Sequence, residues 1–171
     1  MMKKIAGIPK DFSVVQKSRS IRAVTKDRSL ITPLVDAFLT EHYRVSQRVA
    51  GVLEAVAKKD PSVLQPHLKR LLMTLEKGAD TGLKRNIPRI IQWMPVPVSL
   101  QGRMVNVCFD LLADPAELVA PKVFCMTILA NIAKVQPDLK GEVRALIESQ
   151  YNLSTPAFRS RAKRVLKMLE R

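Results

Sequence analysis

The feature of this sequence that most constrains its fold is an apolar stripe that returns at an almost constant interval. Its four copies begin at Val49, Ile87, Cys125 and Ala162, which are 38, 38 and 37 residues apart. Within each copy the spacing is i, i+3, i+4 and i+7, which is one face of an α-helix. All sixteen positions are apolar, so the stripe indicates a helical repeat whose units stack over a shared core. The members are Val49, Val52, Leu53, Val56, Ile87, Ile90, Ile91, Met94, Cys125, Ile128, Leu129, Ile132, Ala162, Val165, Leu166 and Leu169.

A second apolar stripe with the same period lies between the copies of the first. Its clearest copy is the leucine set at 68, 71, 72 and 75, and further copies begin at Leu30, Val105 and Val143. Two interleaved stripes of one period indicate a repeating pair of helices, here called A and B. The predicted A helices are 29–39, 62–77, 98–112 and 138–151. The predicted B helices are 43–58, 81–94, 116–134 and 156–170.

The punctuation of the chain agrees with these helices. Three dipeptides place a capping side chain directly before a proline, which is typical of a helix start: Asp60-Pro61, Asp114-Pro115 and Thr155-Pro156. A partial stripe that includes Val14, Ile21 and Val24 predicts a further helix near 12–26.

The predicted fold class is all-α, an α-α superhelix, as a HEAT/armadillo-like solenoid of about four helix pairs. The period lies between tetratricopeptide and armadillo lengths, and the tetratricopeptide Trp, Gly, Tyr and Pro signature is absent. The predicted organisation is a basic N-terminal segment with a capping helix over 1–28, followed by HEAT-like repeats over 29–171. The repeat boundaries fall near 29–60, 61–97, 98–136 and 137–171.

The chain is strongly basic, with 29 Lys and Arg against 15 Asp and Glu and a formal charge of +14. Residues 1–28 are its densest basic segment, with eight basic and two acidic side chains. This balance favours anionic partners. The start of the chain lacks the apolar run of a secretion signal, and no stretch approaches the ~20 residues needed to span a bilayer. We therefore expect a cytoplasmic protein without membrane insertion.

Four segments carry a resemblance to a known family: HYRVSQRVAGVLE at 42–54, VCFDLL at 107–112, APKVFCM at 120–126 and FRSRAKRVL at 158–166. Over roughly residues 13–170 the chain resembles a family of small HEAT-repeat proteins from Bacteroidetes, whose shared motifs are mostly packing residues. The resemblance implies a helical repeat fold. Some members carry the label adenylosuccinate lyase, but this chain has neither the length nor the Ser-rich catalytic loop of such lyases. No catalytic residue is carried over.

The candidate binding surface lies on the predicted B helices, which line the concave side of such solenoids. Arginine forks and aromatic faces are the groups that bind phosphates or carboxylates and stack on bases. The simpler interpretation is a set of ordinary solvated helix faces in which Trp93 and Phe124 pack against the next repeat. We call this set the B-helix surface and define it as Arg48, Lys84, Arg89, Trp93, Lys122, Phe124, Arg159, Arg161 and Arg164.

The sequence carries no motif for a cofactor, a metal or covalent catalysis. His42 and His67 are isolated from other metal-ligand side chains, and no Gly-rich phosphate loop, nucleophile elbow or CxxC occurs. Cys108 and Cys125 lie on apolar stripes, so we expect buried thiols. We expect no catalytic residue, no cofactor and no metal.

The leading interpretation is a non-catalytic scaffold that binds an acidic protein or peptide segment through the B-helix surface. The alternative partner is a nucleic-acid backbone, since charge sets the sign of the partner and not its class. A DNA alkylbase glycosylase-like enzyme is a third interpretation, because HEAT-like enzymes of that kind combine a basic groove with aromatics and a carboxylate. None of the twelve B-helix positions beside the buried stripe is Asp or Glu, which counts against this interpretation. These positions are Arg48, Gly51, Ala55, Asn86, Arg89, Trp93, Phe124, Thr127, Asn131, Arg161, Arg164 and Met168.

Overall fold

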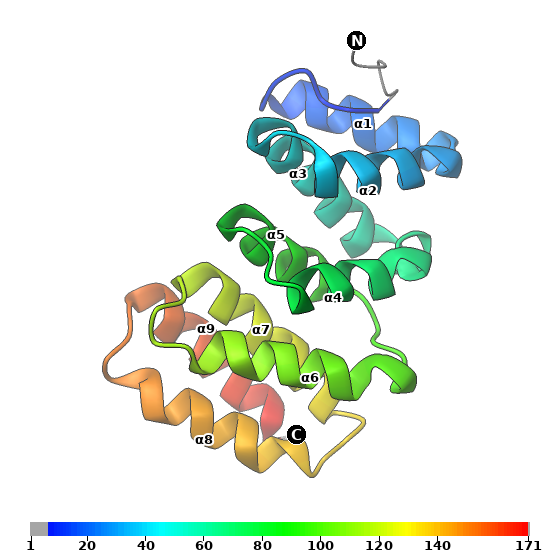
Figure 1. The fold of residues 1–171 in the computed structure, drawn as a ribbon. Coiled ribbons are helices and arrows are strands. Elements are labelled where there is room, and N and C mark those ends of the chain that lie inside the picture. Colours follow the sequence, from blue (N-terminus) through cyan, green and yellow to red (C-terminus); the bar gives the residue numbers. More distant parts are fainter. Residues whose placement is uncertain (1–6, 171) are drawn as a thin grey trace. The chain divides into compact units, whose positions relative to one another are not determined.

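The computed structural model describes residues 7–170, and all regular structure within that range is helical (Figure 1). This confirms the all-α class. The α-helices are α1 (Val14–Lys26), α2 (Ile31–Thr40), α3 (Tyr43–Lys59), α4 (Leu68–Glu76), α5 (Thr81–Ile91), α6 (Val98–Ala113), α7 (Val119–Ala133), α8 (Leu139–Tyr151) and α9 (Pro156–Leu169). Short 3-10 helices are η1 (Arg28–Leu30), η2 (Pro61–Val63) and η3 (Gln65–His67).

The predicted A and B helices are confirmed, with differences at three ends. The segment at 62–67 forms 3-10 turns, so α4 begins only at Leu68. Pro66 has no N–H to donate and disfavours the α conformation in the residue before it, which interrupts a continuous helix there. Residues 92–94 form a turn and a bend after α5 instead of continuing the helix. Helix α7 begins only at Val119, because the Asp114 carboxylate accepts the N–H of Ala116, at 2.8 Å, within a turn and does not cap a helix.

The chain forms two compact units, of which the first is Met1–Met94. Its central helix is α3, which packs against α1, α2 and α5, while α4 packs against α5. Helix α3 buries Val49, Val52 and Leu53 completely. Its N-terminus follows directly on α2. The buried Ser46 hydroxyl donates a hydrogen bond of 2.7 Å to the carbonyl of Phe38, which fixes the tight turn between the two helices.

The second unit is Pro95–Arg171, and its central helix is α7. This helix packs against α6, α8 and α9, and α8 also packs against α9. Because α7 is covered on several sides, it is apolar around most of its circumference, and even Lys122 on it is buried. The Thr155 side chain accepts the N–H of Phe158 at 3.3 Å, so the predicted cap at the start of α9 is confirmed.

The predicted stripe forms the cores of both units. Fifteen of its sixteen members are buried, and Leu166 is half-buried. Each fully buried aliphatic side chain contributes roughly 1.5 to 3 kcal/mol relative to an exposed one. The burial of this stripe is therefore the dominant reason why the helices form where they do. Over the described residues, no helix is both long enough and apolar enough to cross a membrane.

Candidate partner-binding surface

The nine residues of the B-helix surface divide between the two units, so each group is described within its own unit. The first unit holds Arg48 on α3, Lys84 and Arg89 on α5, and Trp93 just after α5. The second unit holds Lys122 and Phe124 on α7, and Arg159, Arg161 and Arg164 on α9.

In the first unit, two of these residues line a pocket of about 340 Å³. We call it the basic pocket, because three of its lining side chains are cations and only one is a carboxylate. Side chains from α3 and α5 meet there with α1 and with the segment before α1. The lining residues are Pro9, Asp11, Phe12, Lys17, Gln47, Arg48, Gly51 and Arg89.

Arg48 is held in this pocket by an aromatic ring rather than by an acid. Its guanidinium carbon lies 5.8 Å from the centre of the Phe12 ring, within the range of a cation–π contact. Its Nε atom is buried and has no hydrogen-bond partner among the described residues. Because this N–H is covered, it is the charge of Arg48 rather than its Nε that a ligand can meet at the pocket.

The one carboxylate of the pocket, Asp11, accepts the backbone N–H of Ser13 at 2.8 Å. Hydrogen bonds from Ser13, and to a smaller degree the charge of Arg48, hold the pKa of Asp11 below its ordinary value. Asp11 therefore stays ionised at neutral pH. An exposed carboxylate with a lowered pKa is also a weak general base, so it offers little to acid–base chemistry.

Arg89 and Trp93, two further residues of the B-helix surface in the first unit, contact residues of α3. Arg89 forms an ion pair with Glu54, and the two side chains are 30% and 20% exposed. The Lys58 ammonium lies 5.0 Å from the centre of the Trp93 ring. These contacts link α5 and the residue Trp93 that follows it to α3, and the Trp93 side chain itself is 40% exposed.

In the second unit, Arg161 connects α9 to α7. Its guanidinium donates hydrogen bonds to the Thr127 hydroxyl, at 2.6 Å, and to the Val123 carbonyl, at 3.4 Å. The guanidinium carbon lies 5.7 Å from the centre of the Phe124 ring. Burial, and secondarily the charge of Arg164, lowers the pKa of Arg161. An arginine remains protonated at neutral pH even so.

The remaining cations of the second unit differ in exposure. Lys122 is only 7% exposed, and its ammonium donates 3.2 Å to the Gln150 side-chain oxygen. Arg159 is half-buried and donates 2.5 Å to the Ser154 carbonyl. Arg164 is exposed. Lys122 is thus a structural cation, whereas Arg164 is open to a partner.

Sequence reasoning placed Arg48 and Arg89 on one surface, and the structure brings both into the basic pocket. It missed the contribution of Asp11, Phe12 and Lys17, which belong to the segment assigned to a cap. The signal that pointed to them was the charge density of residues 1–28, but charge density alone does not place a side chain.

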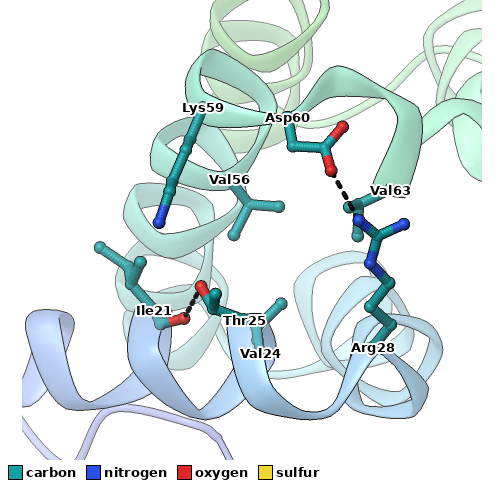
Figure 2. A pocket seen from close by; sticks show the side chains of 8 residues that line it. All are labelled: Ile21, Val24, Thr25, Arg28, Val56, Lys59, Asp60 and Val63. Atoms are coloured by element: carbon teal, nitrogen blue, oxygen red, sulfur yellow. Dashed lines mark hydrogen bonds and ion pairs between the residues drawn. The ribbon is translucent and has the colours of Figure 1, made fainter.

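A second hollow in the first unit is small and apolar (Figure 2). It measures about 90 Å³ and lies where α1, α3 and η2 meet. Its ion pair joins Arg28 to Asp60 at 2.8 Å, and the Thr25 hydroxyl donates 2.9 Å to the Ile21 carbonyl. An apolar cavity of ~150 Å³ is known to bind benzene, and this hollow is smaller than that. Its lining is Ile21, Val24, Thr25, Arg28, Val56, Lys59, Asp60 and Val63.

The described residues contain no group of three or more His, Cys, Asp or Glu side chains placed to hold a metal ion. The His67 imidazole lies 3.5 Å from the Thr32 hydroxyl, and burial, and secondarily the charge of Arg70, lowers the pKa of this imidazole.

Comparison with known proteins gives one result. A family described as a HEAT repeat domain matches residues 12–169, which is nearly the whole chain. No curated protein and no solved structure matches the chain.

Proposed function

The chain belongs to the HEAT repeat domain family, and from that premise we propose that it is a non-catalytic scaffold that binds an acidic protein or peptide segment through the B-helix surface. Helical repeat proteins present extended faces built from successive helix pairs, and such faces serve as binding surfaces. The formal charge of +14 sets the sign of the partner.

The observation that carries this proposal is the basic pocket. Arg48 and Arg89 from two successive B helices meet Lys17 from α1 around one hollow, against a single lining carboxylate. Cations that share a concave, partly desolvated site attract an anion more strongly than the same charges scattered over a surface. Guanidinium forks also match carboxylates in geometry.

One observation favours a protein partner over a nucleic-acid backbone. Duplex or single-stranded nucleic acid is held by many cations along its phosphates. In the second unit Lys122 is buried on Gln150, and Arg159 is held by the Ser154 carbonyl. These side chains are engaged within the chain, which leaves fewer of the predicted cations to follow a phosphate backbone.

The test is a set of binding titrations with fluorescently labelled probes of equal length: an acidic peptide, a basic peptide, single-stranded DNA and duplex DNA. We expect binding to the acidic peptide, no binding to the basic peptide, and weakening as salt rises. The double variant Arg48→Gln with Arg164→Gln should weaken peptide binding. The pair Lys69→Gln with Lys77→Gln, both exposed outside the B-helix surface, is the charge-matched control.

Two outcomes would overturn the proposal. Absence of acidic-peptide binding even at ~50 mM salt, where charge contacts are strong, would remove the acidic partner altogether. Tight binding to duplex DNA with a log–log salt slope near 0.9 per phosphate contact, and none to the peptide, would assign the surface to nucleic acid instead.

A further inference from the structure

We infer that the basic pocket holds one carboxylate side chain of the partner, and that an aliphatic or aromatic neighbour of that acidic residue packs on the exposed apolar residues beside the pocket. This inference rests on the proposed function and goes beyond it. It assigns contact with the partner to Lys17, Arg48 and Phe12, of which Lys17 and Phe12 lie outside the B helices. It also names the partner's local chemistry.

Helix α1 carries Lys17 onto α3. A Cβ atom added at Gly51 would lie 3.7 Å from Lys17 Cε and 3.8 Å from its Nζ. The lysine side chain therefore lies directly over the position where α3 has no side chain. An added Cβ would stand at ordinary contact distance, so only a side chain larger than that of alanine would compete with the ammonium for this space.

Two of the three cations that line the pocket form no ion pair within the described residues. Arg48 contacts the Phe12 ring instead, and because its Nε is covered, its charge rather than that N–H is what it offers to a ligand. Lys17 is half-buried and forms no ion pair with any residue that the structure describes. Arg89, by contrast, is neutralised by Glu54. Two cations thus have charge to offer a ligand, which suits a single carboxylate.

Asp11 is the one acidic side chain that lines the same pocket. Its carboxylate is ionised and acts on Arg48 through its charge, but it is hydrogen-bonded to Ser13 and does not form an ion pair with the arginine within the described residues. It therefore repels an incoming acid without occupying that acid's place. Removing the negative charge of Asp11 should therefore increase the affinity of the pocket for an acidic ligand.

Exposed apolar side chains lie close in the chain to the cation Lys17. Phe12 lines the pocket and is 62% exposed, and the first residues of α1, Val14 and Val15, are 79% and 66% exposed. A peptide that carries an apolar residue next to its acid could bury such side chains on binding. A phosphate backbone offers nothing for aliphatic groups to bury, whereas a peptide with an apolar residue beside its acid does.

The experiment compares labelled peptides that differ at one position, using fluorescence anisotropy. The parent peptide carries Glu-Leu at its centre, a second carries Gln-Leu, and a third carries Glu-Ser. We expect the parent to bind at least tenfold more tightly than the Gln-Leu peptide, since hydrogen bonds between charged groups are worth about 1.5–3 kcal/mol. The Glu-Ser peptide should bind several-fold more weakly than the parent.

The protein variants identify the pocket. Lys17→Gln and Arg48→Gln should each weaken parent-peptide binding about tenfold, and Asp11→Asn should strengthen it several-fold, since Asn retains the oxygen that accepts from Ser13. Gly51→Glu keeps all three cations but places a carboxylate beside Lys17, so it should abolish binding. The control Lys69→Gln removes one exposed charge of α4 and should change the affinity less than twofold. Circular dichroism confirms that each variant is folded.

The outcomes separate this inference from the proposed function. If acidic peptides bind and Arg164→Gln weakens them, while Lys17→Gln, Arg48→Gln and Gly51→Glu bind like the parent protein, the scaffold remains and the pocket is wrong. If no acidic peptide binds, the proposed function itself fails. If the three peptides bind equally, recognition of a paired acidic and apolar residue is excluded.

Discussion

At the scale of single residues, the basic side chains differ in what holds them. Arg89 is neutralised by a carboxylate, Arg161 is held by a hydroxyl and a carbonyl, and Arg48 lies against an aromatic ring. Sequence spacing placed all three on B helices but did not reveal these partners. The partner of Arg161, Thr127, is 34 residues away, and such contacts depend on how two helices pack.

A residue-scale prediction concerns Cys108 and Cys125, which are both fully buried. A hydrogen bond with Cys108, and then burial, raises the pKa of the Cys125 thiol. A raised pKa keeps the group as an unreactive thiol at pH values where an exposed cysteine begins to ionise. We expect the native protein to react with DTNB at pH 8 no faster than it unfolds.

The measurement is the absorbance of released thionitrobenzoate with and without denaturant. In denaturant, two equivalents should appear within the mixing time of a manual assay. Rapid release of one equivalent from the native protein would contradict the burial of these thiols between α6 and α7.

At the scale of elements, the effect of replacing a glycine depends on whether that glycine lies within a helix or after its end. Gly102 in α6 and Gly141 in α8 are exposed, and a Cβ added at either meets nothing within 4 Å. Gly78, after α4, has equal space but a φ of +85°. Gly102→Ala and Gly141→Ala should each stabilise the protein by about 0.5–1 kcal/mol, because alanine loses less backbone freedom in a helix.

The matched control is Gly78→Ala, which should destabilise by roughly 1–2 kcal/mol because an L side chain is strained at that φ. Urea unfolding followed by circular dichroism measures all three variants. The same sign of change at positions 78, 102 and 141 would show that backbone conformation does not decide the effect.

The elements also show how far sequence reasoning reached. The period-38 stripe predicted the helices because the burial of a residue such as Leu53 or Leu129 contributes more than any local preference. The starts of α4 and α7 were less well predicted, since 3-10 turns and an Asp114 turn compete there with an α-helix at similar energies. The basic pocket was predicted only in part. Phe12 lies before α1 in a segment without a repeating pattern, so only packing shows that it meets Arg48.

At the scale of the whole molecule, each unit has its own central helix, α3 in the first and α7 in the second. Val52 and Leu129 are fully buried members of the stripe, one in each unit. Val52→Asp or Leu129→Asp should each lower the free energy of unfolding by several kcal/mol, since a carboxylate buried without a partner must be protonated or drawn into water. The free energy of unfolding of a natural domain is only ~5–15 kcal/mol in total, so either variant should be extensively unfolded.

The control is Val135→Asp, which adds the same charge at a position that is 66% exposed. Thermal melting by circular dichroism compares the three variants with the parent. A melting temperature for Val52→Asp or Leu129→Asp equal to that of the parent would contradict the stripe as the core of the fold.

The oxygens that hold Lys122 and Arg159 belong to a side-chain amide and a backbone carbonyl, and neither carries a formal charge. They fix the position of each cation and leave its electric field uncancelled. Such a field extends into solvent over about 8–10 Å at moderate ionic strength. Under the proposed function, this field should speed the diffusional encounter with an acidic partner in dilute buffer, and high salt should slow that encounter long before it disturbs the helices.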